Sequence, residues 1–111
     1  MLVLLDQGTP APVRQYLPHH IVKTATQQGW ATLANGELLT VAEANGFEVF
    51  VTTDQNLRYQ QNLARRRIAI VVLKQSQWPA LERHVALVVA AVDGAEPGSY
   101  TEVEIPLGDG A

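Results

Sequence analysis

Hydrophobic residues in this chain gather in short continuous runs separated by polar segments. Such runs are typical of strands that are covered on both faces, as in a parallel sheet. The clearest of them, residues 2–5, 48–53 and 68–73, predict three buried strands. A weaker strand is predicted over 21–24, and the alternation of polar and apolar residues over 100–105 predicts an edge strand with one face in water.

Helices are predicted between these runs, over 10–17, 36–45, about 55–65 and 79–92. Asn35 is a good N-cap for the second of them, since its side chain can accept a hydrogen bond from the first turn. The last is apolar over a wider arc than one buried stripe requires, which indicates a contact between two copies in a homodimer. Strands and helices that alternate at this spacing predict right-handed βαβ units and a mostly parallel sheet of four to five strands.

The length of 111 residues suits a single domain over 1–111, with a core of about 1–92 and an acidic linker with an edge strand over 93–111. Apolar residues make up 47% and charged residues 17%, as in a globular protein. No apolar run approaches the roughly 18 residues that span a bilayer, and no basic leader is present, so a cytoplasmic location without membrane association is expected. The absence of cysteine excludes disulfides, thiolate metal sites and cysteine catalysis.

The charges are unevenly distributed along the chain. Residues 93–111 hold 5 of the 11 acidic residues and none of the 8 basic ones, which leaves 8 basic and 6 acidic residues in 1–92, a balance of +2. The body is therefore mildly basic and the end acidic. This balance neither requires nor excludes a nucleic-acid partner, because binding depends on local potential rather than on total charge.

Two of the predicted strands end on an aspartate, since residues 2–5 run into Asp6 and residues 48–53 run into Asp54. Ligands of parallel sheets bind beyond the carboxyl ends of the strands, so both side chains are expected at one edge, with Glu37 at the start of the helix between them. Carboxylates gathered there repel one another unless a cation joins them. Because Mg²⁺ and Mn²⁺ prefer carboxylate and water oxygens, a divalent-metal site with chemistry at phosphate is predicted.

Structural roles also fit these acids. An Asp after a strand often belongs to a turn or caps a helix, and a Glu in a first turn is favoured by the helix dipole. His19 and His20 are not expected to bind one metal, because adjacent strand positions point to opposite faces. The segment DQGT over 6–9 lacks the second aspartate that a phosphoaspartate enzyme would need.

Four arginines on or after the predicted helix that follows Asp54 are candidate nucleic-acid contacts: Arg58, Arg65, Arg66 and Arg67. Neutralisation of phosphates by such side chains supplies most of the sequence-independent affinity for nucleic acids. The same cluster would also suit a solvated helix end, where cations favourably meet the dipole. Both interpretations stay open at the level of the sequence.

Three segments of the chain resemble motifs of small stand-alone PIN-like domains, in the same order and at similar spacing across about residues 2–75. LLDQGTP over 4–10 resembles the LLDENLP opening of that family. GELL over 36–39 is similar to its D-x-E-I/L-L helix start, and VFVTTDQNL over 49–57 resembles its V-x-V-T-x-D-x-D-F strand end. No single motif is specific, but three in register indicate a PIN-like domain.

The resemblance implies a three-layer α/β/α sandwich and a nuclease that depends on Mg²⁺ or Mn²⁺. It implies that Asp6, Glu37 and Asp54 are the catalytic, metal-binding carboxylates. Many members of the family are ribonuclease toxins of bacterial toxin–antitoxin pairs. The implied partners are therefore an RNA substrate, whose phosphodiester bonds are hydrolysed, and an antitoxin protein.

The chain departs from the family pattern at two positions. Asn35 stands where the family tends to have an Asp before the Glu, and Asn56 stands where it tends to have a second Asp after the strand. An Asn can offer a carbonyl oxygen to a metal but adds no charge, so Asn56 is included as a further ligand and Asn35 is interpreted as a helix cap. The alternative is a catalytically weak or inactive PIN-like module that binds RNA or a partner protein.

Overall fold

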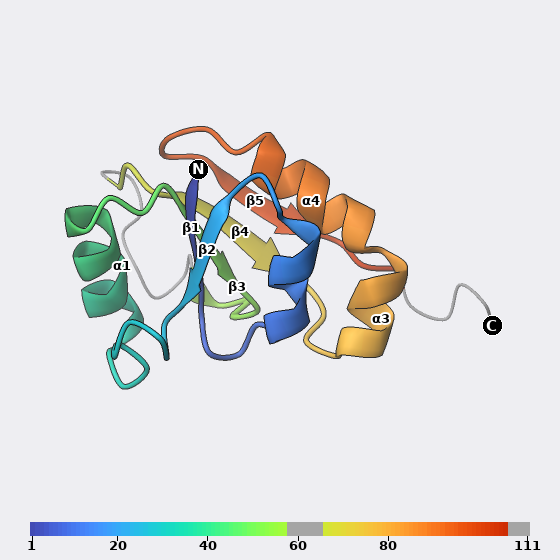
Figure 1. Cartoon of the computed structure of the whole chain (residues 1–111), viewed down its shortest axis with the longest axis horizontal. Helices are drawn as coiled ribbons and strands as arrows, with labels where there is room; N and C mark the ends of the chain where they lie inside the picture. Colours follow the sequence, from blue (N-terminus) through green and yellow to red (C-terminus); the bar gives the residue numbers. More distant parts are fainter. Residues whose placement is uncertain (58–65, 107–111) are drawn as a thin grey trace.

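The computed structural model describes residues 1–57 and 66–106, and within them the chain forms a five-stranded sheet (Figure 1). Neighbouring strands are parallel and follow the order β2-β1-β3-β4-β5. This confirms the predicted mixed α/β fold with a mostly parallel sheet. The strands are β1 (Leu2–Leu5), β2 (Ile21–Thr24), β3 (Val49–Thr52), β4 (Ala69–Leu73) and β5 (Tyr100–Val103).

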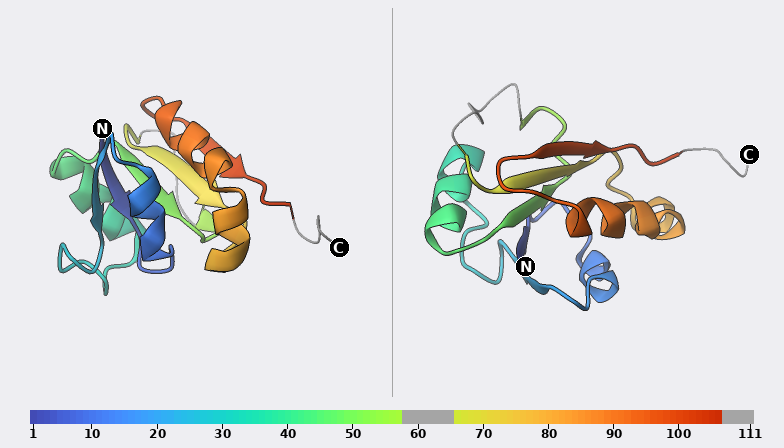
Figure 2. Two further views of the ribbon diagram at one scale, coloured as in Figure 1. Left: turned by 45° about the vertical axis from the view of Figure 1, so that its right-hand side comes forward. Right: turned by 90° about the horizontal axis from the view of Figure 1, so that it is seen from above.

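Helices cover both faces of the sheet (Figure 2). The described helices are the 3₁₀ helix η1 (Ala11–Tyr16) and the α-helices α1 (Asn35–Ala44), α3 (Trp78–Arg83) and α4 (Val85–Asp93). Helix α1 packs on one face, and η1, α3 and α4 pack on the other. None of the helices in residues 1–57 and 66–106 has the length and apolar character needed to cross a bilayer.

Side chains of each strand alternate between two separate cores. Val3, Val51 and Val71 point to the face covered by η1, α3 and α4. Leu4 and Phe50 point to the face covered by α1, and both are fully buried. Burial on both faces explains why these strands are continuous apolar runs rather than alternating ones.

The connections place β1 and β3 side by side in the middle of the sheet. From β1 the chain passes through η1 to β2 at one edge, then returns over the opposite face through α1 to β3. Strand order therefore reverses direction between β1 and β3. In open parallel sheets such a reversal leaves a crevice beyond the carboxyl ends of the two strands, where ligands bind.

One prediction about the helices is wrong in detail. The segment 79–92 is not one helix, because His84 has φ −123° and ψ 25° and separates α3 from α4. The apolar pattern could not reveal this break. Leu81 and Val88 are both buried, and their spacing of seven residues fits one long helix as well as two short ones. Tyr16, the last residue of η1, is 36% exposed, and its ring lies 5.8 Å from that of Trp78. Most of the predicted helix over 55–65 lies outside the described residues.

The Glu43 carboxylate joins the end of α1 to the segment just before β4 through hydrogen bonds. Its Oε1 accepts a hydrogen bond from Arg66 Nη1 at 2.9 Å, and its Oε2 accepts the backbone N–H groups of Arg67 and Ile68 at 2.6 and 3.1 Å. Burial by itself raises the pKa of Glu43, but these donors outweigh it and hold the pKa below its ordinary value of 4.5. The ionised carboxylate is therefore the form that stabilises this junction.

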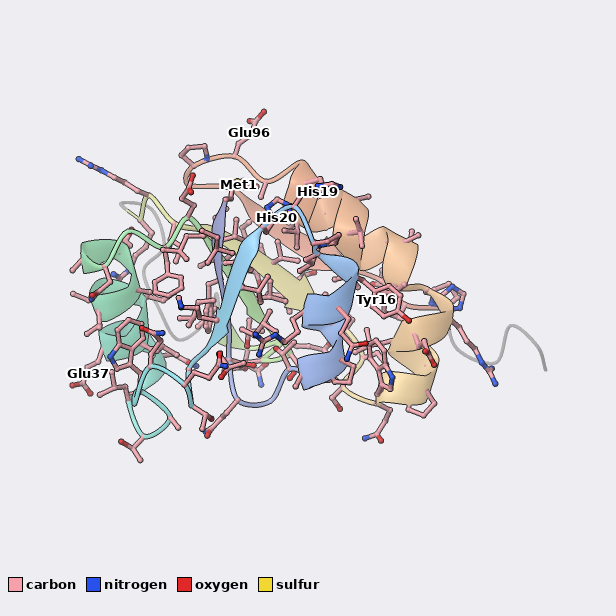
Figure 3. The ribbon with its side chains drawn as sticks, in the orientation of Figure 1. Met1, Tyr16, His19, His20, Glu37 and Glu96 are labelled. Carbon is pink, nitrogen blue, oxygen red and sulfur yellow. The ribbon has the colours of Figure 1, made fainter. Side chains whose placement is uncertain are left out.

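We expect Glu43→Gln to lower the free energy of unfolding by about 1 kcal/mol at pH 7, since the pair is partly open to solvent and screened. Because the folded pKa is depressed, this contribution is complete above the ordinary value of 4.5 and is lost as the pH falls through the folded pKa. Urea unfolding of both proteins between pH 7 and pH 3 measures the difference. Glu96→Gln, at a carboxylate that points to solvent (Figure 3), is the control. A pH-independent difference would contradict this account.

Candidate functional site

Asp6 lies at the point where β1 ends, and hydrogen bonds from its backbone and its carboxylate fix it there. Its backbone N–H donates to the carbonyl oxygen of Val51 at 3.0 Å, across to β3. Its Oδ1 accepts the backbone N–H of Gly8 at 3.1 Å and the hydroxyl of Thr9 at 2.7 Å. Its Oδ2 accepts the hydroxyl of Thr52. The carboxylate therefore has a defined orientation in a tight turn.

Asp54 lies two residues beyond the end of β3 and is held as firmly. Its Oδ1 accepts the backbone N–H of Asn56 at 2.9 Å, which closes a turn after the strand. Its Oδ2 accepts a hydrogen bond from the side-chain amide of Asn35 at 2.8 Å. One carboxylate thus joins the end of β3 to the start of α1.

Thr52 connects the two aspartates. Its hydroxyl donates to Asp6 Oδ2 and accepts the backbone N–H of Asp54 at 3.0 Å, and the residue is fully buried. The structure therefore brings Asp6 and Asp54 to neighbouring strand ends, at the reversal of strand order. Sequence reasoning overlooked Thr52, although its place two residues before Asp54 in an otherwise apolar strand puts both on one face.

Glu37 is not gathered with these two aspartates. Asn35 faces Asp54, and a residue two positions further along an α-helix is rotated by about 200°. Glu37 accordingly is exposed and points outward from α1 (Figure 3). It lines a surface hollow of about 480 Å³ together with Thr40 and Arg66. The described residues contain no group of three or more His, Cys, Asp or Glu side chains arranged to hold a metal ion.

Asn35 is not the cap of α1. Ala34 occupies the N-cap position without a side-chain hydrogen bond, and the N–H of Leu38 donates to its carbonyl at 2.8 Å. Asn35 is the first helical residue, and its amide is directed to Asp54 instead. The prediction of a cap was wrong because the helix begins one residue earlier than expected, and the Asn35 amide donates to an ionised carboxylate, which is a strong acceptor.

The remaining predicted site residues are dispersed. Asn56 is exposed and contacts Asp54 through its backbone, so its side chain as a metal ligand stays a prediction. Arg66 and Arg67 precede β4, at the edge of the sheet opposite the aspartates. The guanidinium of Arg66 is hydrogen-bonded to α1, so its role as a phosphate contact, like that of Arg67, stays a prediction. Arg58 and Arg65 lie outside the described residues.

No family model, curated protein or solved structure matches this chain significantly. What the site can do must therefore be inferred from its own residues and from the motifs described above.

The donor set of Asp6 and Asp54 fits one hard divalent cation. Mg²⁺ is commonly bound through one or two carboxylates, with waters and substrate phosphates in the other positions. An ionised carboxylate offers about four acceptor positions. Asp6 accepts three of the hydrogen bonds given above and Asp54 accepts two, so each keeps capacity for a cation.

We expect Thr52→Val to lower the free energy of unfolding by about 2–3 kcal/mol, because the charged Asp6 carboxylate and the Asp54 N–H both lose a partner. Thr52→Ser keeps the hydroxyl and is the matched control, with a smaller loss of about 1 kcal/mol for the missing methyl. Chemical denaturation measures all three proteins. Equal losses in the two variants would show that the methyl group, and not the hydroxyl, matters here.

We expect Asn35→Asp to make the melting temperature depend on divalent cations. The change puts a second carboxylate against Asp54 Oδ2, where like charges repel unless a cation lies between them. In EDTA the variant should melt below the wild type, and Mg²⁺ or Mn²⁺ should raise its melting temperature more than that of the wild type. Asn45→Asp, at the far end of α1, controls for the added charge. A cation response shared by both variants would argue against a metal position beside Asp54.

Proposed function

We propose that this protein is a small PIN-like nuclease that hydrolyses phosphodiester bonds in RNA with Mg²⁺ or Mn²⁺ as its cofactor. The observation that supports this most is the pair Asp6 and Asp54, bonded to one Thr52 hydroxyl at the reversal of strand order. The motif resemblance supplies the substrate class, since carboxylates in these places are the metal ligands of PIN-like ribonucleases. The three-layer PIN-like sandwich is part of the same proposal.

In this proposal Asp6 and Asp54 hold the cation, and their neighbours fix both carboxylates. Thr9 and Thr52 orient Asp6, while Asn35 holds Asp54, so that neither ligand has to be ordered when the cation binds. The bound ion would polarise a phosphoryl oxygen and lower the pKa of an attacking water. Glu37, which the resemblance makes the third ligand, points away and would have to approach for it to take part.

A second candidate is a PIN-like module that binds RNA or a partner protein without cutting. Its support is the contact between the Asn35 amide and Asp54 Oδ2, because a hydrogen-bond donor occupies an oxygen that a cation would use. Leu87 on α4 is 43% exposed, which is consistent with a protein partner on that helix. The partner would be an antitoxin if the protein belongs to a toxin–antitoxin pair, or a second copy in a homodimer.

The nuclease proposal predicts cation binding and RNA cleavage that both need the two aspartates. Titration calorimetry with Mn²⁺ should show binding to the wild type that Asp6→Asn and Asp54→Asn each lose. A fluorescent RNA incubated with Mn²⁺ should be cut by the wild type and at least about 100-fold more slowly by either variant, since each removes charge stabilisation of the transition state.

The control for both assays is Glu96→Gln, a solvent-facing carboxylate at the opposite edge, which should behave as the wild type. Glu37→Gln reports whether the third carboxylate takes part. RNA binding without Mn²⁺ binding or cleavage would favour the second candidate. Cleavage that persists in Asp54→Asn would eliminate the proposed site.

A further inference from the structure

An ion pair lies near the two aspartates, on the strand beside β3. Lys74 directly follows β4, and its backbone N–H donates to the carbonyl of Val103 at 3.1 Å, so the pairing with β5 continues through it. Its ammonium nitrogen is 3.1 Å from Glu104 Oε1 and 3.9 Å from Glu102 Oε1. One cation is thus held by two carboxylates of the acidic C-terminal region.

The strand register places this cation at the same edge of the sheet as the candidate site. Thr52 of β3 pairs with Val72 of β4, so Asp54 and Lys74 each follow that pair by two residues. Parallel neighbours lie roughly 4.8 Å apart, and residues two apart share a face. Val72 packs in the core beneath α1, so Lys74 lies on the α1 side of the sheet, as Asp54 does through its bond to Asn35.

The ion pair is open enough to be exchanged. The Glu104 side chain is 80% exposed and that of Lys74 is 30% exposed. Ion pairs between exposed groups contribute little to stability and are weakened by salt. An ammonium group on a flexible stem donates to a carboxylate oxygen or to a phosphate oxygen in the same way, and lysine is a common phosphate ligand. A phosphate could therefore replace Glu104 without disturbing the fold.

We propose that Lys74 is a phosphate-binding residue for RNA at the candidate site, and that Glu102 and Glu104 occupy it until RNA displaces them. The proposal rests on RNA being the ligand of the proposed nuclease or module. It assigns a role to the acidic end of the chain: these carboxylates compete within the molecule for the position of a phosphate. It also explains how a chain with a net charge of −3 can present a cation to an anionic polymer.

Fluorescence anisotropy with the full-length protein and a fluorescein-labelled single-stranded RNA tests this, with EDTA present so that nothing is cut. Lys74→Gln should weaken binding several-fold and reduce the slope of log affinity against log salt by about 0.7, the value for one phosphate contact on a single strand. Lys74→Arg should retain the affinity. Glu104→Gln should tighten binding several-fold, and this gain should vanish in the double variant with Lys74→Gln.

Glu96→Gln removes the same charge at the far edge of the sheet and separates a local effect from a long-range one. The proposal is overturned if Lys74→Gln binds RNA as the wild type does. It is equally overturned if Glu104→Gln raises the RNA affinity no more than Glu96→Gln does. The same holds if Glu104→Gln raises the affinity as much in the Lys74→Gln background as in the wild type. The anisotropy assay measures binding and not cleavage. If Asp54→Asn still cleaves RNA, the nuclease proposal fails, but the binding result for Lys74 still stands. Conversely, Asp54-dependent cleavage with no effect of Lys74 refutes this inference alone.

Discussion

The sheet is buried on both faces, and this constraint decides where polar chemistry can be placed. Strands β1, β3 and β4 are apolar almost from end to end, because α1 covers one face and η1, α3 and α4 cover the other. In these three strands, polar side chains are therefore confined to the strand ends. Since all five strands are parallel, their carboxyl ends form one edge, and the residues of the candidate site follow from that single direction.

The strands and the positions of Asp6 and Asp54 could be predicted from the sequence, because short continuous apolar runs between turn residues are typical of strands buried on both faces. The role of Asn35 could not, because a capping side chain and one that reaches another strand look alike in sequence. The orientation of Glu37 depends on the rotational phase of α1, which tertiary contacts set. Arg66 was open to two interpretations as a surface cation, and neither included its actual partner, Glu43, which is distant in sequence.

The feature that distinguishes the two candidate functions lies at the start of α1. Helix α1 is held at its first residue, where Asn35 meets Asp54, and on its flank, where Arg66 Nη2 donates to the carbonyl of Gly36 at 3.2 Å. These contacts give the helix a fixed rotation, with the Asn35 amide toward Asp54 and Glu37 toward solvent. An uncharged residue thus stands where more negative charge would favour a cation, while the two strand-end carboxylates remain in place. The fold can persist whichever function the site performs.

Thr52 has one hydroxyl proton, which it donates in a hydrogen bond to Asp6 Oδ2. The same hydroxyl oxygen accepts a hydrogen bond from the N–H of Asp54. Hydrogen bonds in a chain polarise one another, so the strength of this bond depends on the bond that the Thr52 hydroxyl donates to Asp6. Removing the Asp6 carboxylate would therefore also change the hydrogen bond between Thr52 and the Asp54 N–H, in the turn that follows β3. The carboxylate of one aspartate and the backbone N–H of the other are thus linked through a single buried oxygen atom.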